Sequence, residues 1–234
     1  MVEVLRTRPT VHDGQAHAGC EMRIGILVEC GYDGLEDIFV RRVCQLLRAE
    51  AGEPLTVEMV PMDNKAQLIR ECGPAVAGLL ESGCDQVVIL WDQRPAWPKS
   101  GEPLCWLNDR RDILANLQTA GLEDYPIGLV CIEREFESWL LFDEKMLQCV
   151  LCTPEHPRLR ISPPRNPDTN RNPKGAMMSL FKQHGKRYVD VDFAKRLANC
   201  LTALNRLRRC KTFKSKKREG VSSIPNTRST SDIV

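Results

Sequence analysis

The feature that most constrains the fold of this chain is an alternation of short apolar segments with segments of helical periodicity. Four apolar segments are predicted as strands: Arg23–Glu29, Leu55–Val60, Gln86–Trp91 and Pro126–Ile132. After each of them, apolar residues recur every three or four positions, as on one face of a helix. This βα alternation with short connections predicts an α/β fold, with a mainly parallel four-stranded sheet and helices on both faces.

The helix boundaries follow from capping and helix-breaking residues. Asp33 is expected to cap the first helix, with Glu36 as its capping-box partner, and Gly73-Pro74 is expected to kink or divide the second. Asp143 is expected to cap a segment that begins at Glu144. The later helices are predicted over Asn64–Leu80, Asn108–Gly121, Glu133–Leu151, Gly175–His184 and Asp190–Arg208.

Carboxylates follow three of the predicted strands. Glu29 ends the first strand, Asp92 follows the third, and Glu133, Glu135 and Glu137 follow the fourth. The carboxyl ends of parallel strands share one edge of the sheet, where ligands bind. Mg²⁺ prefers oxygen ligands and needs only one or two carboxylates beside a substrate phosphate. The pattern therefore predicts a site for Mg²⁺ or Mn²⁺ with Glu29, Asp92 and Glu137 as metal ligands, and with Glu135 as a further catalytic residue.

Each of these side chains also has a structural interpretation, which the sequence leaves open. Glu29 fits a strand-end carboxylate bonded to the start of the next helix, and acids such as Glu135 and Glu137 favour a helix N-terminus whether or not a metal binds. Trp139 lies in an apolar block and is expected in the core rather than on a base-stacking surface.

The charge is unevenly distributed along the chain. From Lys174 to Arg218 there are 14 lysines and arginines against two acids, while the rest carries 19 basic and 29 acidic residues. A basic C-terminal region predicts an anionic partner. The candidate nucleic-acid-binding residues are Lys174, Arg208, Arg209, Lys211 and Lys214. A solvated charged surface explains the same residues nearly as well.

The 11 cysteines show no disulfide framework and are expected to be reduced thiols, mostly in the core. Cys149-Val-Leu-Cys152 is the one CxxC, and without a second ligand pair we expect no zinc there. No apolar run approaches the roughly 18 residues of a membrane span, and the start of the chain lacks the apolar core of a secretory signal. We therefore expect a cytoplasmic protein.

The expected organisation is one domain with appendages. Residues 1–21 are expected to be a disordered leader, and 22–152 the α/β domain. Residues 153–213 begin with a proline-rich loop and continue as a basic helical extension of the same domain, and 214–234 are expected to be a disordered tail. Met1 and Met22 are both candidate translation starts.

Five segments together resemble a known family. RIGILVECGYDGLEDIF, VVILWDQR, CIEREFESWLLFDEKML, NPKGAMMSLF and RLRRCKTFK occur in this order across most of the chain. The set is similar to the Toprim-like domain-of-unknown-function 4276 family, and hence to the Toprim domain of overcoming-lysogenisation-defect nucleases. The resemblance implies that Glu29 matches the family glutamate and Asp92 the first aspartate of an Asp-x-Asp pair that binds Mg²⁺ for phosphoryl transfer on nucleic acid.

The sequence departs from the family pattern in two places. Cys30 separates Glu29 from Gly31, and Asp-x-Asp is replaced by Asp92-Gln93-Arg94. The resemblance implies a Mg²⁺-dependent nuclease that works with an AAA-type ATPase, in settings suggestive of phage defence. The missing second aspartate favours the alternative, a non-catalytic Toprim-like subunit that binds a partner ATPase or nucleic acid.

Overall fold

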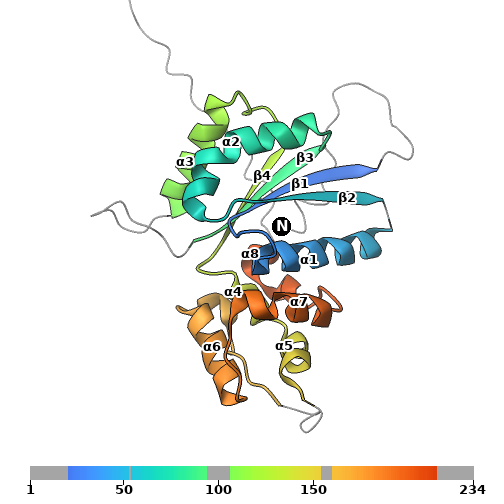
Figure 1. The fold of residues 1–234 in the computed structure, drawn as a ribbon, viewed down its shortest axis with the longest axis vertical. Coiled ribbons are helices and arrows are strands. Elements are labelled where there is room, and N and C mark those ends of the chain that lie inside the picture. Colours follow the sequence, from blue (N-terminus) through green and yellow to red (C-terminus); the bar gives the residue numbers. More distant parts are fainter. Residues whose placement is uncertain (1–20, 53, 94–105, 154–159, 215–234) are drawn as a thin grey trace, which may run out of the picture.

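The structure, a computed structural model, describes residues 21–52, 54–93, 106–153 and 160–214. It confirms the α/β class, because its four strands form one all-parallel sheet with the order β2-β1-β3-β4 (Figure 1). The strands are β1 (Met22–Val28), β2 (Leu55–Pro61), β3 (Gln86–Asp92) and β4 (Ile127–Ile132). Within the described residues, no helix is both long and apolar enough to cross a membrane.

Helices connect the strands and continue beyond them. Those of the βα alternation are α1 (Leu35–Ala51), α2 (Lys65–Glu81) and α3 (Trp106–Thr119). After β4 follow α4 (Glu137–Leu140), α5 (Glu144–Leu151), α6 (Pro173–Gln183), α7 (Asp190–Cys200) and α8 (Lys211–Lys214), with 3-10 turns at Pro167–Thr169 and Leu207–Arg209. The predicted helical extension is thus present, and Figure 1 shows α6 in the lower part of the molecule and α8 beside α1.

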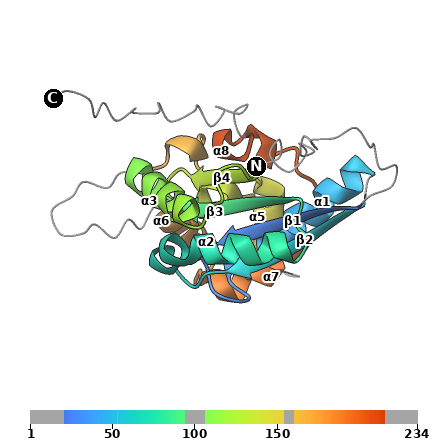
Figure 2. The same cartoon turned by 90° about the horizontal axis from the view of Figure 1, so that it is seen from above.

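Side chains from the two faces of the sheet enter two separate cores. Along β1, Ile24 and Ile26 pack with α1 and with the helices of the C-terminal half, whereas Leu27 packs with α2 and α3. Figures 1 and 2 show α2 and α3 on one face of the sheet and α1 on the other. Trp139 is fully buried in the first core, as predicted, and its ring meets those of Phe136 and Phe213.

Gly73-Pro74 was expected to kink or divide α2. The helix contains Pro74 and remains one element, so it is not divided. Proline has no N–H to donate to the carbonyl of Arg70, four residues earlier. Asn116 of α3 supplies a donor instead, because its Nδ2 lies 2.9 Å from that carbonyl oxygen. Its Oδ1 also accepts the Gly73 N–H, at 2.7 Å. A side chain from the neighbouring helix thus satisfies the backbone that Pro74 interrupts.

Two predicted boundaries near the carboxyl edge of the sheet are wrong. Asp33 does not cap α1, because its backbone is left-handed (φ 56°) and the cap is Gly34. The helix predicted from Glu133 to Leu151 is broken, because the chain turns after β4, at Arg134 (φ 75°), and then forms α4 and α5 separately. Asp143 does cap α5 as predicted, since its Oδ1 accepts the Met146 N–H at 3.0 Å.

The helix predicted over Asp190–Arg208 is also too long, because α7 ends at Cys200. Leu201, Leu204 and Leu207 are spaced by three positions, as on one face of a helix. In the structure they lie in a series of turns after α7, and their side chains are buried in the first core. The predicted leader and tail lie outside the described residues, apart from Glu21 and from Lys214, which ends α8.

The expectation of reduced thiols is wrong for one pair of cysteines. Cys149 of α5 and Cys200 of α7 form a disulfide across 51 positions of sequence. Cys44, Cys72, Cys84 and Cys210 are free thiols buried in the cores, as expected. The sequence did not reveal the pairing, because it depends on how α7 packs beside α5.

Candidate active site

Glu29 and Asp92 meet at the carboxyl edge of the sheet. Val28 of β1 lies beside Leu90 of β3, so Glu29 and Asp92 follow at neighbouring positions. The Asp92 N–H donates to Glu29 Oε2 at 3.0 Å. The Asp92 carboxylate is buried, and its Oδ2 accepts the Phe136 N–H at 2.8 Å. Its Oδ1 is also buried but has no hydrogen-bond partner among the described residues.

Two further carboxylates lie within electrostatic range of Asp92. Burial raises the pKa of Asp92 well above its ordinary value, and the charges of Glu29, Glu36 and Glu137 raise it further. Glu36 lies in the first turn of α1 and Glu137 begins α4, so both helices start at this edge of the sheet. We call Glu29, Glu36, Asp92 and Glu137 the carboxylate cluster. Sequence reasoning assigned Glu36 only to capping, because a sequence does not show which way a side chain in the first turn of a helix faces.

The carboxylate cluster resists full ionisation. Burial raises the pKa of Glu29 to about 7, although the nearby charge of Lys65 acts in the opposite direction. Burial likewise raises the pKa of Glu137 to about 7, against the effect of Lys174. Buried carboxylates of like charge hold protons at neutral pH unless a cation neutralises them. The cluster therefore has the electrostatics of a site that gains from binding a cation.

Lys174 lies against this cluster at the start of α6. Its Nζ is 2.8 Å from Asp190 Oδ2 and 3.8 Å from Glu137 Oε1. The Tyr188 hydroxyl donates to the same Glu137 oxygen at 3.3 Å. Glu135 binds the backbone instead, because its Oε2 accepts the Lys174 N–H at 2.9 Å. The residues predicted from two distant segments are thus brought together, with Glu135 holding the N-terminus of α6.

Lys65 supplies a second cation that sequence reasoning missed. Its side chain is buried, and its Nζ donates to the Gln93 carbonyl at 3.1 Å and lies 3.4 Å from Asp109 Oδ2. Lys65 is the first residue of α2, after the cap Asn64, so it too stands where a helix begins. Position 94, where the sequence replaces an expected aspartate by arginine, lies outside the described residues.

The donor chemistry of the cluster fits a hard divalent cation, but the donors do not converge on one point. Carboxylate oxygens are the ligands that Mg²⁺ prefers, and Asp92 offers an unpartnered buried oxygen. In the described part of the chain, no three acidic, histidine or cysteine side chains are grouped closely enough to hold a metal ion. Binding would therefore require carboxylate rotations that bring Glu29, Asp92 and Glu137 toward a common position.

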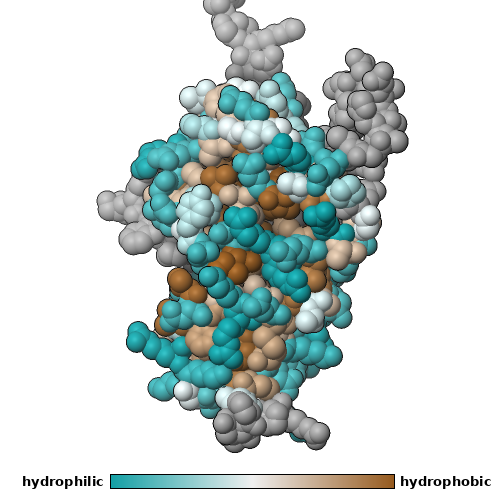
Figure 3. All heavy atoms as spheres, turned by 45° about the vertical axis from the view of Figure 1, so that its right-hand side comes forward, coloured by the Kyte–Doolittle hydropathy of each residue, from teal (hydrophilic) through white to brown (hydrophobic). Residues whose placement is uncertain are grey.

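The residues predicted to bind nucleic acid differ in whether their side chains already bond to other residues of the protein. Arg208 pairs with Glu50 of α1, and Arg209 Nη2 donates to the Phe142 carbonyl at 2.8 Å. The side chains of Lys211 and Lys214 are on the surface at the end of the described chain. On the face drawn in Figure 3, hydrophilic side chains predominate and apolar ones form small separate patches.

Comparison of the chain with known protein families, with curated proteins and with solved structures finds no match in any of the three. The resemblance to the Toprim-like family therefore rests on the sequence segments quoted above.

Proposed function

We propose that this protein is a Toprim-like nuclease that hydrolyses phosphodiester bonds of DNA or RNA with Mg²⁺ or Mn²⁺. The observation that carries the proposal is the buried carboxylate cluster at the carboxyl edge of a parallel sheet, the edge at which ligands bind in such folds. Groups with pKa values shifted by burial and by a specific neighbouring charge are typical of functional sites.

In this proposal Glu29 and Asp92 hold the metal, and Glu137 completes the ligand set from α4. A metal bound there supplies a Lewis acid for a phosphoryl oxygen and lowers the pKa of a bound water. The buried Asp92 Oδ1 accepts no hydrogen bond from the described residues, so nothing among them compensates for its loss of hydration on folding. A bound cation would provide that compensation, which supports the assignment of Asp92 as a ligand. Glu36 adds negative charge from α1 and raises the pKa of Asp92 through that charge.

The surrounding residues of the chain would orient this set and the substrate. The Tyr188 hydroxyl fixes Glu137 through its hydrogen bond, and Asp190 holds the Lys174 ammonium beside the same carboxylate. The Lys174 side chain remains 47% exposed, so it can contact a substrate phosphate without leaving Asp190. Lys211 and Lys214 would hold the nucleic-acid backbone farther from the reacting bond, independently of sequence.

The biological setting belongs to the same proposal. The resemblance to the Toprim-like family suggests an effector that acts in the cytoplasm with an AAA-type ATPase, in phage defence.

A second function is favoured by a specific observation, namely that two lysines already lie beside the cluster. Lys65 and Lys174 partly neutralise its charge, and the carboxylates do not converge on one point. A non-catalytic Toprim-like subunit that binds a partner ATPase or nucleic acid would keep this arrangement without a metal. The two functions differ in whether a divalent cation binds with measurable affinity.

The proposal is tested by measuring Mn²⁺ binding by calorimetry and the nicking of supercoiled DNA and of RNA in parallel. The wild type should bind Mn²⁺, and Glu29→Gln and Asp92→Asn should each lose that binding and at least about 100-fold of the activity. An amide keeps the shape of the carboxyl group but removes the charge that the cation needs. Glu133→Gln is the matched control, because Glu133 directly follows a strand, as Glu29 does, but is exposed.

Equal Mn²⁺ affinity in wild type, Glu29→Gln and Asp92→Asn would contradict the assigned ligands. A wild type that neither binds Mn²⁺ nor cleaves nucleic acid, alone or with its ATPase, would establish the non-catalytic subunit instead. Circular dichroism of each variant separates loss of the site from loss of the fold.

A further inference from the structure

Tyr32 is an exposed aromatic residue beside the candidate site. It is 81% exposed, the largest exposed fraction of any large apolar residue in the described part of the chain. It lies in the loop of residues 30–34, between Glu29, directly after β1, and Glu36 in the first turn of α1. Single exposed apolar residues are common on protein surfaces, so exposure alone assigns no role. Here the glutamates on both sides of the loop belong to the carboxylate cluster, which places the tyrosine at its edge.

The turn that carries Tyr32 is fixed by hydrogen bonds. Tyr32 and Asp33 are its two central residues. The Gly34 N–H donates to the Gly31 carbonyl at 3.0 Å and so closes the turn. The Asp33 backbone is left-handed (φ 56°), and its N–H donates to Asp37 Oδ2 at 3.3 Å. A tyrosine side chain has only two rotatable bonds, so a ligand that stacks on this ring has little freedom to immobilise.

Lys174 provides an exposed cation near the same turn. Burial raises the pKa of Glu36 and the charge of Lys174 lowers it, so the ammonium lies within electrostatic range of the helix that begins after Tyr32. Met178 lies one turn after Lys174 on the same side of α6, and both residues are exposed. Proteins that bind single-stranded nucleic acid combine cations for the phosphates with aromatic rings for the faces of the bases.

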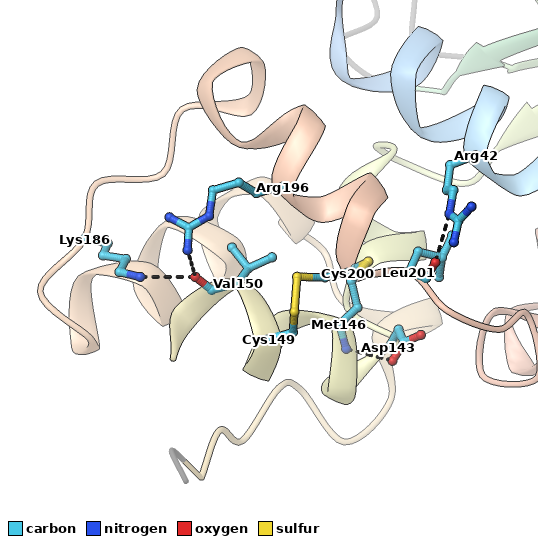
Figure 4. The surroundings of a disulfide bond; sticks show 9 residues. All are labelled: Arg42, Asp143, Met146, Cys149, Val150, Lys186, Arg196, Cys200 and Leu201. Atoms are coloured by element: carbon cyan, nitrogen blue, oxygen red, sulfur yellow. Dashed lines mark hydrogen bonds between the residues drawn. A yellow bond between two sulfur atoms is a disulfide. The ribbon is translucent and has the colours of Figure 1, made fainter. Parts of the chain in front are cut away.

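The helices on which these groups depend are tied together. Helix α7 packs along α1, and Arg42 Nε of α1 donates to the Leu201 carbonyl, just after α7, at 3.1 Å (Figure 4). The disulfide between Cys149 and Cys200 joins the end of α7 to α5. The first residue of α7 holds the Lys174 ammonium at 2.8 Å. The ammonium is therefore positioned relative to α1, and hence to the turn that precedes α1.

We propose that Tyr32 is a stacking platform for an unpaired nucleobase, so that the candidate site prefers single-stranded DNA or RNA to a duplex. This inference rests on the proposed function and names the substrate class that the carboxylate cluster leaves open. In a duplex both faces of a base are covered by its neighbours, whereas a single strand leaves faces free for an aromatic ring. Stacking is tolerant of sequence, because every base has such a face.

The test measures the affinity of the full chain for a labelled single-stranded DNA, the same sequence as RNA, and the DNA duplex, by fluorescence anisotropy. Each titration is made with EDTA and again with Ca²⁺, so that binding is read without cleavage. Tyr32→Ala should weaken single-strand binding about tenfold, and should change duplex binding less than about twofold. Tyr32→Phe should bind as wild type, because it keeps the ring, whereas Tyr32→Leu should behave as Tyr32→Ala, because an aliphatic side chain has no flat face.

Tyr125→Ala is the matched control. Tyr125 is also exposed, at 50%, but it precedes β4 and so lies at the opposite edge of the sheet from the carboxylate cluster. This variant should bind every strand as wild type does. An oligonucleotide with 2-aminopurine reports the stacking itself: its fluorescence should fall on binding to wild type and Tyr32→Phe, and fall less with Tyr32→Ala.

The outcomes separate this inference from the nuclease proposal. A Tyr32-dependent affinity for DNA alone, RNA alone or both supports the platform and identifies the strand, even if no metal binds and nothing is cleaved. The platform is overturned if wild type binds neither single strand in either buffer, if Tyr32→Ala binds single strands as wild type does, or if it loses duplex affinity equally. Loss of Mn²⁺ binding in Glu29→Gln, with Tyr32→Ala unchanged, would leave the nuclease proposal standing without the platform.

Discussion

Asp92 is the residue on which the electrostatics of the candidate site depend. Its buried carboxylate has one oxygen bonded to the Phe136 N–H and one without a partner in the described part of the chain. Three neighbouring carboxylates raise its pKa further than burial alone does. Such an arrangement destabilises the folded chain at high pH, because charges that repel one another must be held together in a region of low dielectric.

This cost predicts how stability depends on pH. The pKa values of Glu29 and Glu137 rise from 4.5 to about 7 on folding, so between these values the folded state binds protons that the unfolded state has released. Stability should therefore fall as pH increases from about 5 to about 8, by on the order of 3 kcal/mol for each group. Urea denaturation at both pH values measures the change.

Glu29→Gln provides the decisive comparison for this pH dependence. It should reduce the loss of stability between pH 5 and pH 8, because the amide does not titrate, while Glu133→Gln should behave as wild type. Mn²⁺ in excess should also restore stability to the wild type at pH 8 and not to Glu29→Gln. Parallel pH dependences in all three proteins would show that Glu29 does not titrate as assigned.

The sequence allowed Glu29 and Asp92 to be paired, because both follow strands and parallel strands end at one edge. It could not place Lys65 or Glu36, since a residue in the first turn of a helix can face toward the edge or away from it. The direction is set by how the helix packs on the sheet. Asn116 was missed for the same reason, because its partners are backbone atoms of another helix.

At the scale of elements, α2 and α3 are coupled through Asn116. The side chain bridges the Gly73 N–H and the Arg70 carbonyl, which are the groups beside the gap made by Pro74. A Cβ on Gly73 would lie 2.6 Å from Asn116 Oδ1, so glycine is required for this contact. Proline removes a backbone hydrogen bond from any helix, and here the side chain of a neighbouring helix compensates for that loss.

The coupling predicts that Asn116→Ala lowers the free energy of unfolding by about 2 to 3 kcal/mol, because two backbone groups lose their partner. Gln118→Ala, an exposed change in the same helix, should alter stability by less than about 0.5 kcal/mol. In a Pro74→Ala background, the N–H of residue 74 can donate to the Arg70 carbonyl, so Asn116→Ala should cost less there. Equal costs in both backgrounds, measured by chemical denaturation, would rule out the bridge.

The other elements differ in how well local sequence determines them. The four strands were predicted to within about two residues, because each is an apolar run bounded by turns. The break at Arg134 was not predicted, because no glycine or proline marks the position at which the backbone becomes left-handed. The end of α7 was missed because leucines spaced by three positions fit both a helix and a series of turns.

At the scale of the whole molecule, the carboxylate cluster and the basic C-terminal region carry opposite charge. The chain has 33 lysines and arginines against 31 acids, so its small net charge conceals this separation. Arg206 and Arg208 are partly engaged by Asp143 and Glu50 within the protein. The capacity to bind a polyanion should therefore depend most on the exposed Lys211 and Lys214.

This distribution predicts the salt dependence of nucleic-acid binding. Replacing Lys211 and Lys214 together by alanine should weaken binding similarly on unrelated sequences, and should reduce the slope of log K against log salt by about one for each lost phosphate contact. Fluorescence anisotropy at several salt concentrations measures both quantities. Lys145 and Lys182, two exposed lysines on α5 and α6, provide the matched double variant, which should keep the wild-type slope. An unchanged slope in the Lys211 and Lys214 variant would contradict the assignment.

The two cores also impose an order on events while the chain is being synthesised. The buried residues of the core formed with α2 and α3 end at Leu122, whereas the other core includes Phe213. The ribosome synthesises the chain from its N-terminus. The face of the sheet that packs against α2 and α3 can therefore be buried before the helices that bury the other face have been made. Until then Trp139 has no Phe213 to pack against. A nascent chain stalled after β4 would therefore present an apolar surface to chaperones, and a premature stop codon there would yield a substrate for proteases rather than a smaller domain.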